Sequence, residues 1–145
     1  MIESKIVKTP VSVEKNHDLE SVVLLYDKAC KLANKQKYDE AILYYDQILA
    51  IDKNHLDSLY CKGLTLCYMG EYENALSCLD KALEINPRSI SSLRTKANAL
   101  YELGRYEESI SYYDKTLEIN AKDSDALFGK RVALYVNGKH SPMYG

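Results

Sequence analysis

The chain has 145 residues, with 19 basic and 21 acidic side chains and a formal net charge of −2 at pH 7. A length of this order fits one domain or one repeat array, and so small a charge gives no field that favours nucleic acid or anionic lipid. No stretch approaches the roughly 20 apolar residues of a membrane span, and the first ten residues lack the apolar core of a secretory signal. We therefore expect a cytoplasmic protein without a nucleic-acid or membrane partner.

Residues 1–18 carry Pro10, mixed charges and β-branched residues without a long period, which predicts a flexible N-terminal arm. Asp18 is a candidate N-cap for the first helix, and Asn16 is the alternative. From there the pattern is helical, and it stops after Gly138, which leaves a C-terminal tail at 139–145. The expected helices lie near residues 19–35, 38–51, 55–68, 72–85, 89–102, 106–119 and 123–136.

The helical pattern repeats with a fixed period of 34 residues, which is seen in two series. Ala29, Gly63 and Ala97 share one register, and aromatic residues beginning at Tyr38 share another. A period of this size is typical of an array of helix–turn–helix units. The first helix of each unit has one apolar stripe, formed by Leu25, Leu32, Leu59, Leu66, Leu93, Leu100, Leu127 and Leu134.

Residues between the helices also follow the period. Gly70, Gly104 and Gly138 are predicted to end the first helix of a unit in a left-handed conformation, and Gln36 takes that place in the first unit. Arg131 takes the slot of the small residues named above, which fits a last helix without a following neighbour.

The second unit carries the landmarks Gly63, Ala75, Ala82 and Pro87, and these residues resemble the tetratricopeptide repeat. Leucine replaces the tryptophan of that pattern in every unit. The resemblance implies an all-α fold, a right-handed superhelix of antiparallel helix pairs (an α-solenoid). The solenoid would span residues 19–138, with repeats at about 22–55, 56–89 and 90–123 and a capping helix at 124–137.

No arrangement of residues indicates catalysis. His17, His55 and His140 fall in the arm, an inter-repeat turn and the tail, without ligand spacing, so we interpret them as solvated. The four cysteines form no C-x-x-C motif and are expected to be reduced. We therefore expect no enzyme, no metal and no cofactor.

The charged residues repeat with the fold. Asp46, Asp80 and Asp114 share one slot, and a series of lysines that includes Lys62 shares another. Pairs such as Asp46–Lys62 can form across neighbouring repeats. A charge that follows the period favours a solvated ladder over an acid–base pair.

In the tetratricopeptide family the first helices of the repeats line a concave groove that holds a peptide or a partner's helix. The resemblance implies a groove here that is aromatic and apolar, with an arginine and an asparagine as polar groups, a composition typical of interface anchors. Phe128, Val132 and Tyr135 of the last helix extend it. The other expected groove residues are Tyr26, Cys30, Tyr60, Cys61, Leu64, Tyr68, Arg94, Asn98 and Tyr101.

The resemblance thus favours a protein-interaction module, a scaffold or adaptor, with a protein or peptide partner. Two alternatives remain open: the tyrosines pack on one another or on the arm, or the chain forms a homo-oligomer through repeat faces or the last helix. One subset of the family binds acidic chaperone tails through a lysine–asparagine–arginine clamp. The five clamp places hold Tyr26, Cys30, Cys61, Ser91 and Thr95, so that role is not expected.

Overall fold

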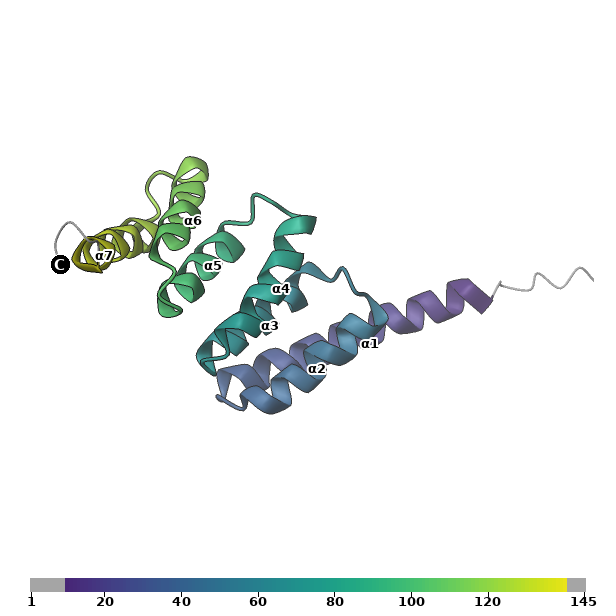
Figure 1. Ribbon diagram of the computed structural model, residues 1–145. Helices are drawn as coiled ribbons and strands as arrows, with labels where there is room; N and C mark the ends of the chain where they lie inside the picture. The colour runs from purple at the N-terminus through teal and green to yellow at the C-terminus, as the bar shows by residue number, and fades with distance from the viewer. Residues whose placement is uncertain (1–9, 141–145) are drawn as a thin grey trace, which may run out of the picture. The chain divides into compact units, whose positions relative to one another are not determined.

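The computed structural model describes residues 10–140, and within them every regular element is an α-helix (Figure 1). Three helix pairs and a final single helix give the all-α arrangement of three repeats and a cap that the sequence predicts. The chain divides into two compact units, residues 1–53 and 54–145, which are described separately. The helices are α1 (Pro10–Asn34), α2 (Tyr38–Ile51), α3 (Leu56–Tyr68), α4 (Tyr72–Ile85), α5 (Ile90–Glu102), α6 (Tyr106–Ile119) and α7 (Ser124–His140).

The first unit is the antiparallel pair α1 and α2. Ala29 of α1 and Ala41 of α2 are fully buried, and such small side chains let two helices approach closely. Tyr45 fills the space beside them, with its ring tilted against Tyr26 at 6.4 Å between centroids. Its hydroxyl donates a long hydrogen bond of 3.9 Å to the Cys30 sulfur. Tyr26 and Cys30 therefore pack within their own repeat.

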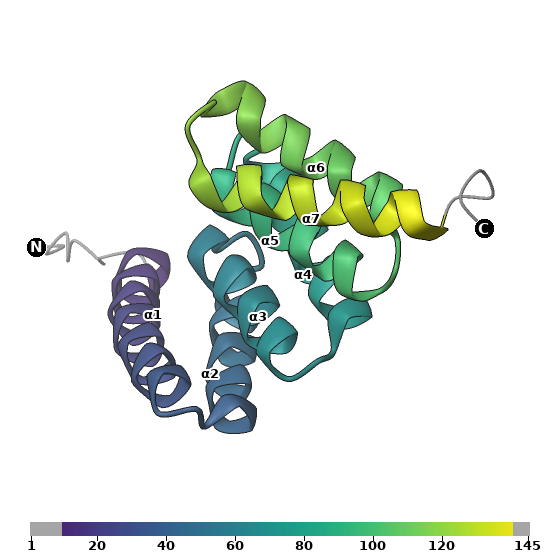
Figure 2. The same ribbon diagram turned by 90° about the vertical axis from the view of Figure 1, so that its left-hand side faces the viewer.

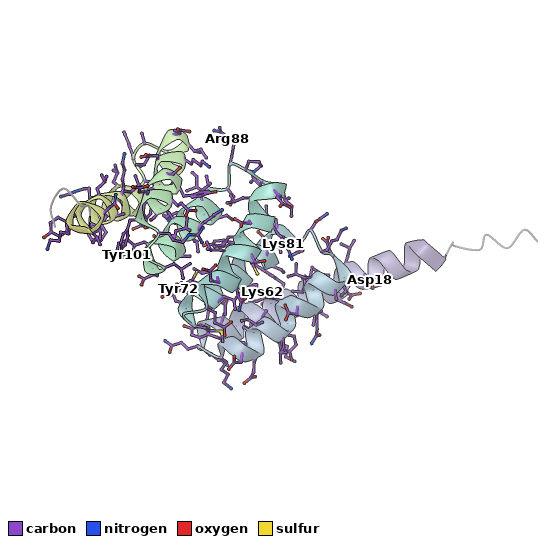
Figure 3. The ribbon with its side chains drawn as sticks, in the orientation of Figure 1. Asp18, Lys62, Tyr72, Lys81, Arg88 and Tyr101 are labelled. Atoms are coloured by element: carbon purple, nitrogen blue, oxygen red, sulfur yellow. The ribbon has the colours of Figure 1, made fainter. Side chains whose placement is uncertain are left out.

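The start of α1 differs from the sequence prediction. The helix begins at Pro10, so the prediction of an arm up to residue 18 is wrong for residues 10–18, and Asp18 lies inside the helix (Figure 3). Proline is well tolerated at the first helical position, and no glycine or second proline follows it before residue 18. Adding turns to an existing helix also costs less than nucleating one. Residues 1–9 lie outside the described part of the chain.

The second unit contains α3 to α7, and each helix packs on its neighbours in sequence. The helix α5 also contacts α3 and α7, and Figure 2 shows α7 running beside α6. Small residues lie at the contacts between helices: a Cβ atom on Gly63 would be 3.0 Å from the Leu79 Cγ atom and 3.5 Å from the Ala75 carbonyl oxygen. Gly63 therefore lies against α4, as its register predicts.

The turns inside the repeats follow the prediction at three of four positions. Gln36, Gly70 and Gly104 have φ values of 61°, 77° and 76°, in the left-handed region that reverses the chain. The prediction is wrong for Gly138, because α7 continues through it to His140. At the other three positions the next helix folds back onto the first. No helix packs back onto α7 among residues 10–140, so the chain there has no reason to turn.

The predicted charge ladder is present in the second unit. Lys96 of α5 pairs with Asp80 of α4, and Lys130 of α7 pairs with Asp114 of α6 at 2.5 Å. Both pairs join the first helix of one repeat to the second helix of the repeat before it. They tie neighbouring repeats together at the surface.

His55 has a structural role that its position in the sequence did not indicate. Its Nδ1 atom accepts a hydrogen bond of 3.2 Å from the Ser58 backbone and so caps the start of α3. Ser89 caps α5 in the same way. The interpretation of His55 as a solvated histidine is therefore wrong, since its half-buried ring satisfies a free helical N–H group.

Candidate functional site

A cleft of about 310 Å³ opens between α5 and α7, and the ring of Tyr113 from α6 lies at its base. Its lining follows one stripe on each helix, because residues three or four apart share a helix face. The stripe on α5 is Arg94, Asn98 and Tyr101, and that on α7 is Asp125, Phe128, Gly129 and Val132. The cleft lies wholly within the second unit.

Tyr113 fixes the base of the cleft. Its ring is buried, and its hydroxyl donates a hydrogen bond to the Asn98 side-chain oxygen. Burial raises the pKa of Tyr113 to about 12, so the hydroxyl keeps its proton at neutral pH and remains a donor. This bond orients the exposed Asn98 amide, whose nitrogen can still donate to a ligand.

Gly129 makes room for that tyrosine. A Cβ atom at position 129 would lie 2.4 Å from the Tyr113 Cζ atom and 2.6 Å from its hydroxyl oxygen. Any side chain here would therefore push the tyrosine ring away from Asn98. The corresponding positions in the two preceding repeats are Cys61 and Thr95, so the glycine is particular to the last helix.

Arg94 is held by acidic groups from the start of α7. Its Nη1 atom donates to the Asp123 Oδ2 atom at 2.7 Å and lies 3.8 Å from the Asp125 Oδ2 atom. The other Asp123 oxygen accepts the Ala126 N–H at 2.9 Å and so caps α7. Arg94 therefore connects α5 to the N-terminus of α7, a contact that no spacing in the sequence indicated.

The two aromatic rings that line the cleft from α5 and α7 differ in how far they are exposed to solvent. Phe128 is 68% exposed, so most of its ring faces solvent. Tyr101 is half-buried, and its ring is tilted against Tyr106 at 5.4 Å between centroids. Figure 3 marks Tyr101 on α5. The Tyr101 ring thus packs against a neighbouring ring, whereas the Phe128 ring is largely exposed to solvent. Val132 also lines the cleft.

Three of the nine residues in the predicted groove meet in this cleft: Arg94, Asn98 and Tyr101. Phe128 and Val132, predicted to extend the groove, line it as well, whereas Tyr135, predicted with them, does not. The remaining residues lie elsewhere: Tyr26 and Cys30 in the first unit, and Tyr60, Cys61, Leu64 and Tyr68 on α3. A continuous groove formed by all nine stays a prediction.

The sequence did not indicate Tyr113, Asp125 or Gly129 as residues of the site, although all three line the cleft. Tyr113 lies on the second helix of its repeat, whereas the family pattern assigns the inner wall to first helices. Gly129 gave a usable signal, because a glycine within a strongly helical pattern often marks a close approach of another group.

Other kinds of site have little support in the described residues. No group of three or more histidine, cysteine or acidic side chains within residues 10–140 is placed to hold a metal ion. Over the same residues, no helix combines the length and apolar character needed to cross a bilayer.

Helix pairs in a 34-residue register define a helical repeat protein, and comparison with known families makes this specific. A model described as anaphase-promoting complex, cyclosome, subunit 3 matches residues 34–116, and a tetratricopeptide repeat model matches residues 94–141. The first of these matches covers more than half of the chain. The chain belongs to this family of tetratricopeptide repeat proteins.

Solved structures share the fold at low sequence identity. The first tetratricopeptide domain of Spaghetti (RPAP3), bound to an HSP90 peptide, is 20% identical with a TM-score of 0.79, covering 82% of this chain and 94% of that one. The Sgt2 domain from Aspergillus fumigatus is 16% identical with a TM-score of 0.77, covering 82% and 80%. MamA is 21% identical with a TM-score of 0.78, covering 83% and 66%. A search of curated proteins found no match.

Proposed function

We propose that the chain is a protein-interaction module and that the cleft between α5 and α7 binds an extended segment of a partner protein. The observation that carries the proposal is the open ring of Phe128 in a cleft that also has an oriented amide donor. Exposed aromatic area favours association, because it can be buried at a low cost in side-chain entropy. Related domains are found with peptides, as the RPAP3 domain with its HSP90 peptide is.

The size of the cleft suits part of a peptide. A volume of about 310 Å³ is at the lower end for small-molecule sites, which span roughly 300–1,000 Å³. One large side chain would occupy part of it, between Phe128 and Tyr101. The Asn98 amide nitrogen would then donate to a backbone carbonyl of the same segment. Apolar burial would supply affinity, and the amide would fix the direction of the peptide.

Self-association is the second candidate function, and one observation favours it. Leu127 and Leu134 of α7 are 44% and 49% exposed, although the leucines in the same slots of α5 are buried. A second copy of the chain could cover this face. Molecular mass measured across a dilution series separates the two candidates, because a stable dimer at low concentration would favour self-association.

The peptide proposal is tested by selecting binders from a random-sequence peptide library with the full chain as bait. The tightest peptide is then titrated against the wild type and against Phe128→Ala and Tyr101→Ala. We expect each substitution to weaken binding by about 1 kcal/mol or more, as is usual for aromatic anchors.

The matched control is Tyr135→Ala. Tyr135 is also an aromatic residue of α7, and its exposure of 65% is close to that of Phe128, but it does not line the cleft. Binding should be unchanged in this variant. If Tyr135→Ala abolishes binding while both cleft variants keep full affinity, the binding site lies elsewhere on α7.

A further inference from the structure

We propose that the cleft between α5 and α7 selects a basic side chain, lysine or arginine, from the partner segment. This inference rests on the proposed function, and it specifies the ligand chemistry of the same site. It follows from the charges at the mouth of the cleft and from its aromatic walls.

The charges around Arg94 do not balance. One guanidinium faces two carboxylates, of which Asp123 is nearly buried, with 8% of its side chain exposed, and makes the close contact at 2.7 Å. Asp125 lies farther away, at 3.8 Å, with 77% of its side chain exposed. The surplus negative charge is therefore on the exposed carboxylate, and that residue lines the cleft. A cation in the cleft would complete the balance.

The walls suit a long basic side chain. Its methylene groups can pack against Val132 and Phe128 while its charged end stays near the mouth of the cleft, since lysine and arginine commonly bury their stems in this way. Cations are also attracted to the faces of aromatic rings, and Phe128 presents an open ring. The same chain shows this contact elsewhere, where the Lys96 nitrogen lies 4.2 Å from the centre of the Tyr112 ring.

An acidic ligand fits the same cleft poorly. Two carboxylates already share the charge of the Arg94 guanidinium, so a ligand carboxylate would gain little attraction from it. Drawing Arg94 away from Asp123 would also be costly, because it would leave a nearly buried carboxylate without its cation. The incoming acid would also meet Asp125. Arg94 therefore serves to hold α5 to the start of α7 rather than to receive an anion.

The test uses the tightest peptide from the selection, resynthesised with lysine, norleucine or glutamate at its anchor position. Norleucine keeps the methylene stem of lysine and removes the charge. Titrated against the wild-type chain at low salt, the lysine form should bind about 3- to 10-fold tighter than the norleucine form. The glutamate form should bind more weakly than both.

Asp125→Asn and Asp57→Asn provide the matched pair of variants. Asp57 occupies the slot of Asp125 in the first turn of α3, and it does not line the cleft. Each variant is first checked for an unchanged melting temperature. The advantage of lysine over norleucine should shrink about 2- to 5-fold in Asp125→Asn and persist in Asp57→Asn.

Three results would overturn the inference, and they differ in what they imply for the proposed function. Equal binding of the lysine and norleucine forms, with loss of binding in Phe128→Ala, would leave an apolar cleft without charge selection. Tighter binding of the glutamate form would show that the cleft receives an anion. Binding that does not depend on Phe128 would remove the cleft, and with it both proposals.

Discussion

The helices α5 and α7 carry the same leucine register but use it differently. Leu93 and Leu100 of α5 are 3% and 1% exposed, whereas Leu127 and Leu134 in the same slots of α7 are 44% and 49% exposed. The cause is the number of neighbours: α5 packs against both α4 and α6, whereas α7 packs on α6 and has no following partner among residues 10–140. A slot in the pattern thus defines an apolar face, and a neighbouring helix decides whether that face is buried.

The register position of Ala97 in α5 and Arg131 in α7 also shows that a neighbouring helix decides whether a side chain is buried. Ala97 of α5 is fully buried, and its carbonyl oxygen accepts a hydrogen bond of 2.7 Å from the Ser109 hydroxyl of α6. In α7 the slot holds Arg131, which is exposed, as expected for a last helix without a following neighbour. The side of α7 that faces α5 is different again, since it forms the cleft. The helix α7 is therefore a cap on one side and a candidate binding surface on another.

Replacing a leucine of α5 and the matching leucine of α7 by alanine should give the largest difference in the free energy of unfolding. Leu100→Ala should destabilise the second unit by about 2–5 kcal/mol, because a buried leucine leaves a cavity. Leu134→Ala should cost less than about 1 kcal/mol, because the side chain is already half in solvent. Denaturant unfolding of the two variants measures both values. Equal costs would mean that the Leu134 face is covered in solution, and would favour self-association.

Adding a methyl group to two glycines of α7 tests the packing of the cleft. Gly129→Ala should cost about 1–3 kcal/mol, because the new Cβ atom would overlap the Tyr113 ring. Gly138→Ala meets nothing within 4 Å and should stabilise the helix by up to about 1 kcal/mol. Thermal melts of the two variants should therefore shift in opposite directions. An unchanged melting temperature in Gly129→Ala would show that Tyr113 does not pack beneath this position.

Tyr113→Phe removes the hydroxyl that reaches Asn98 across the base of the cleft. Loss of this hydrogen bond should cost about 0.5–1.5 kcal/mol at neutral pH. The pKa of Tyr113 is raised in the folded state to about 12, so the group stabilises the fold fully below its unfolded pKa of about 10. That contribution should be lost as pH rises from 10 to 12.

Unfolding free energies of the wild type and of Tyr113→Phe, measured between pH 9 and 12, check this effect. The difference between them isolates Tyr113 from the other groups that titrate in the same range. The difference in unfolding free energy between the two proteins should narrow with rising pH and then change sign, because a rise in the pKa of Tyr113 from about 10 to about 12 corresponds to about 2.7 kcal/mol. A constant difference would contradict the raised pKa.

The two ion pairs of the second unit, Lys96–Asp80 and Lys130–Asp114, should give the smallest difference in the free energy of unfolding. Burial opposes the charge on Lys96, but hydrogen bonds to Asp80 and Tyr112 outweigh it and raise the pKa of the lysine. Lys96→Met should therefore cost up to about 1 kcal/mol. Lys130→Met should cost less, because Lys130 is more exposed and its pair with Asp114 comes without the additional hydrogen bond that Lys96 donates to Tyr112. Denaturant unfolding at low and high salt would compare them, and the reverse order would contradict this account.

The sequence predicts the repeats closely because several units report the same register. The expected bounds of α2, α4 and α6 agree with the structure, and those of α3 and α5 differ by one residue. The errors fall at the two ends. At Pro10 no other unit supplies a register, and at Gly138 the register holds but no following helix among residues 10–140 requires the turn. Local propensity alone does not decide whether a helix continues there.

The candidate site could be predicted only in part. Arg94, Asn98 and Tyr101 follow from the register, because they repeat the face that other first helices present. The base of the cleft does not follow, since it depends on Gly129 having no side chain and on a tyrosine that reaches across to Asn98. The bond from Arg94 to Asp123 joins α5 to the residue that caps α7, which no local pattern specifies.

The central claim is that a partner segment binds between α5 and α7, and a nitrogen–proton correlation spectrum of the chain tests it most directly. On titration with the selected peptide, we expect the side-chain amide signals of Asn98 and the backbone signals of Phe128 to Val132 to shift together and saturate at one affinity. The signals of Leu127 and Leu134 should change less than these. Shifts centred on Leu134 and Tyr135, with the Asn98 amide unmoved, would contradict the claim.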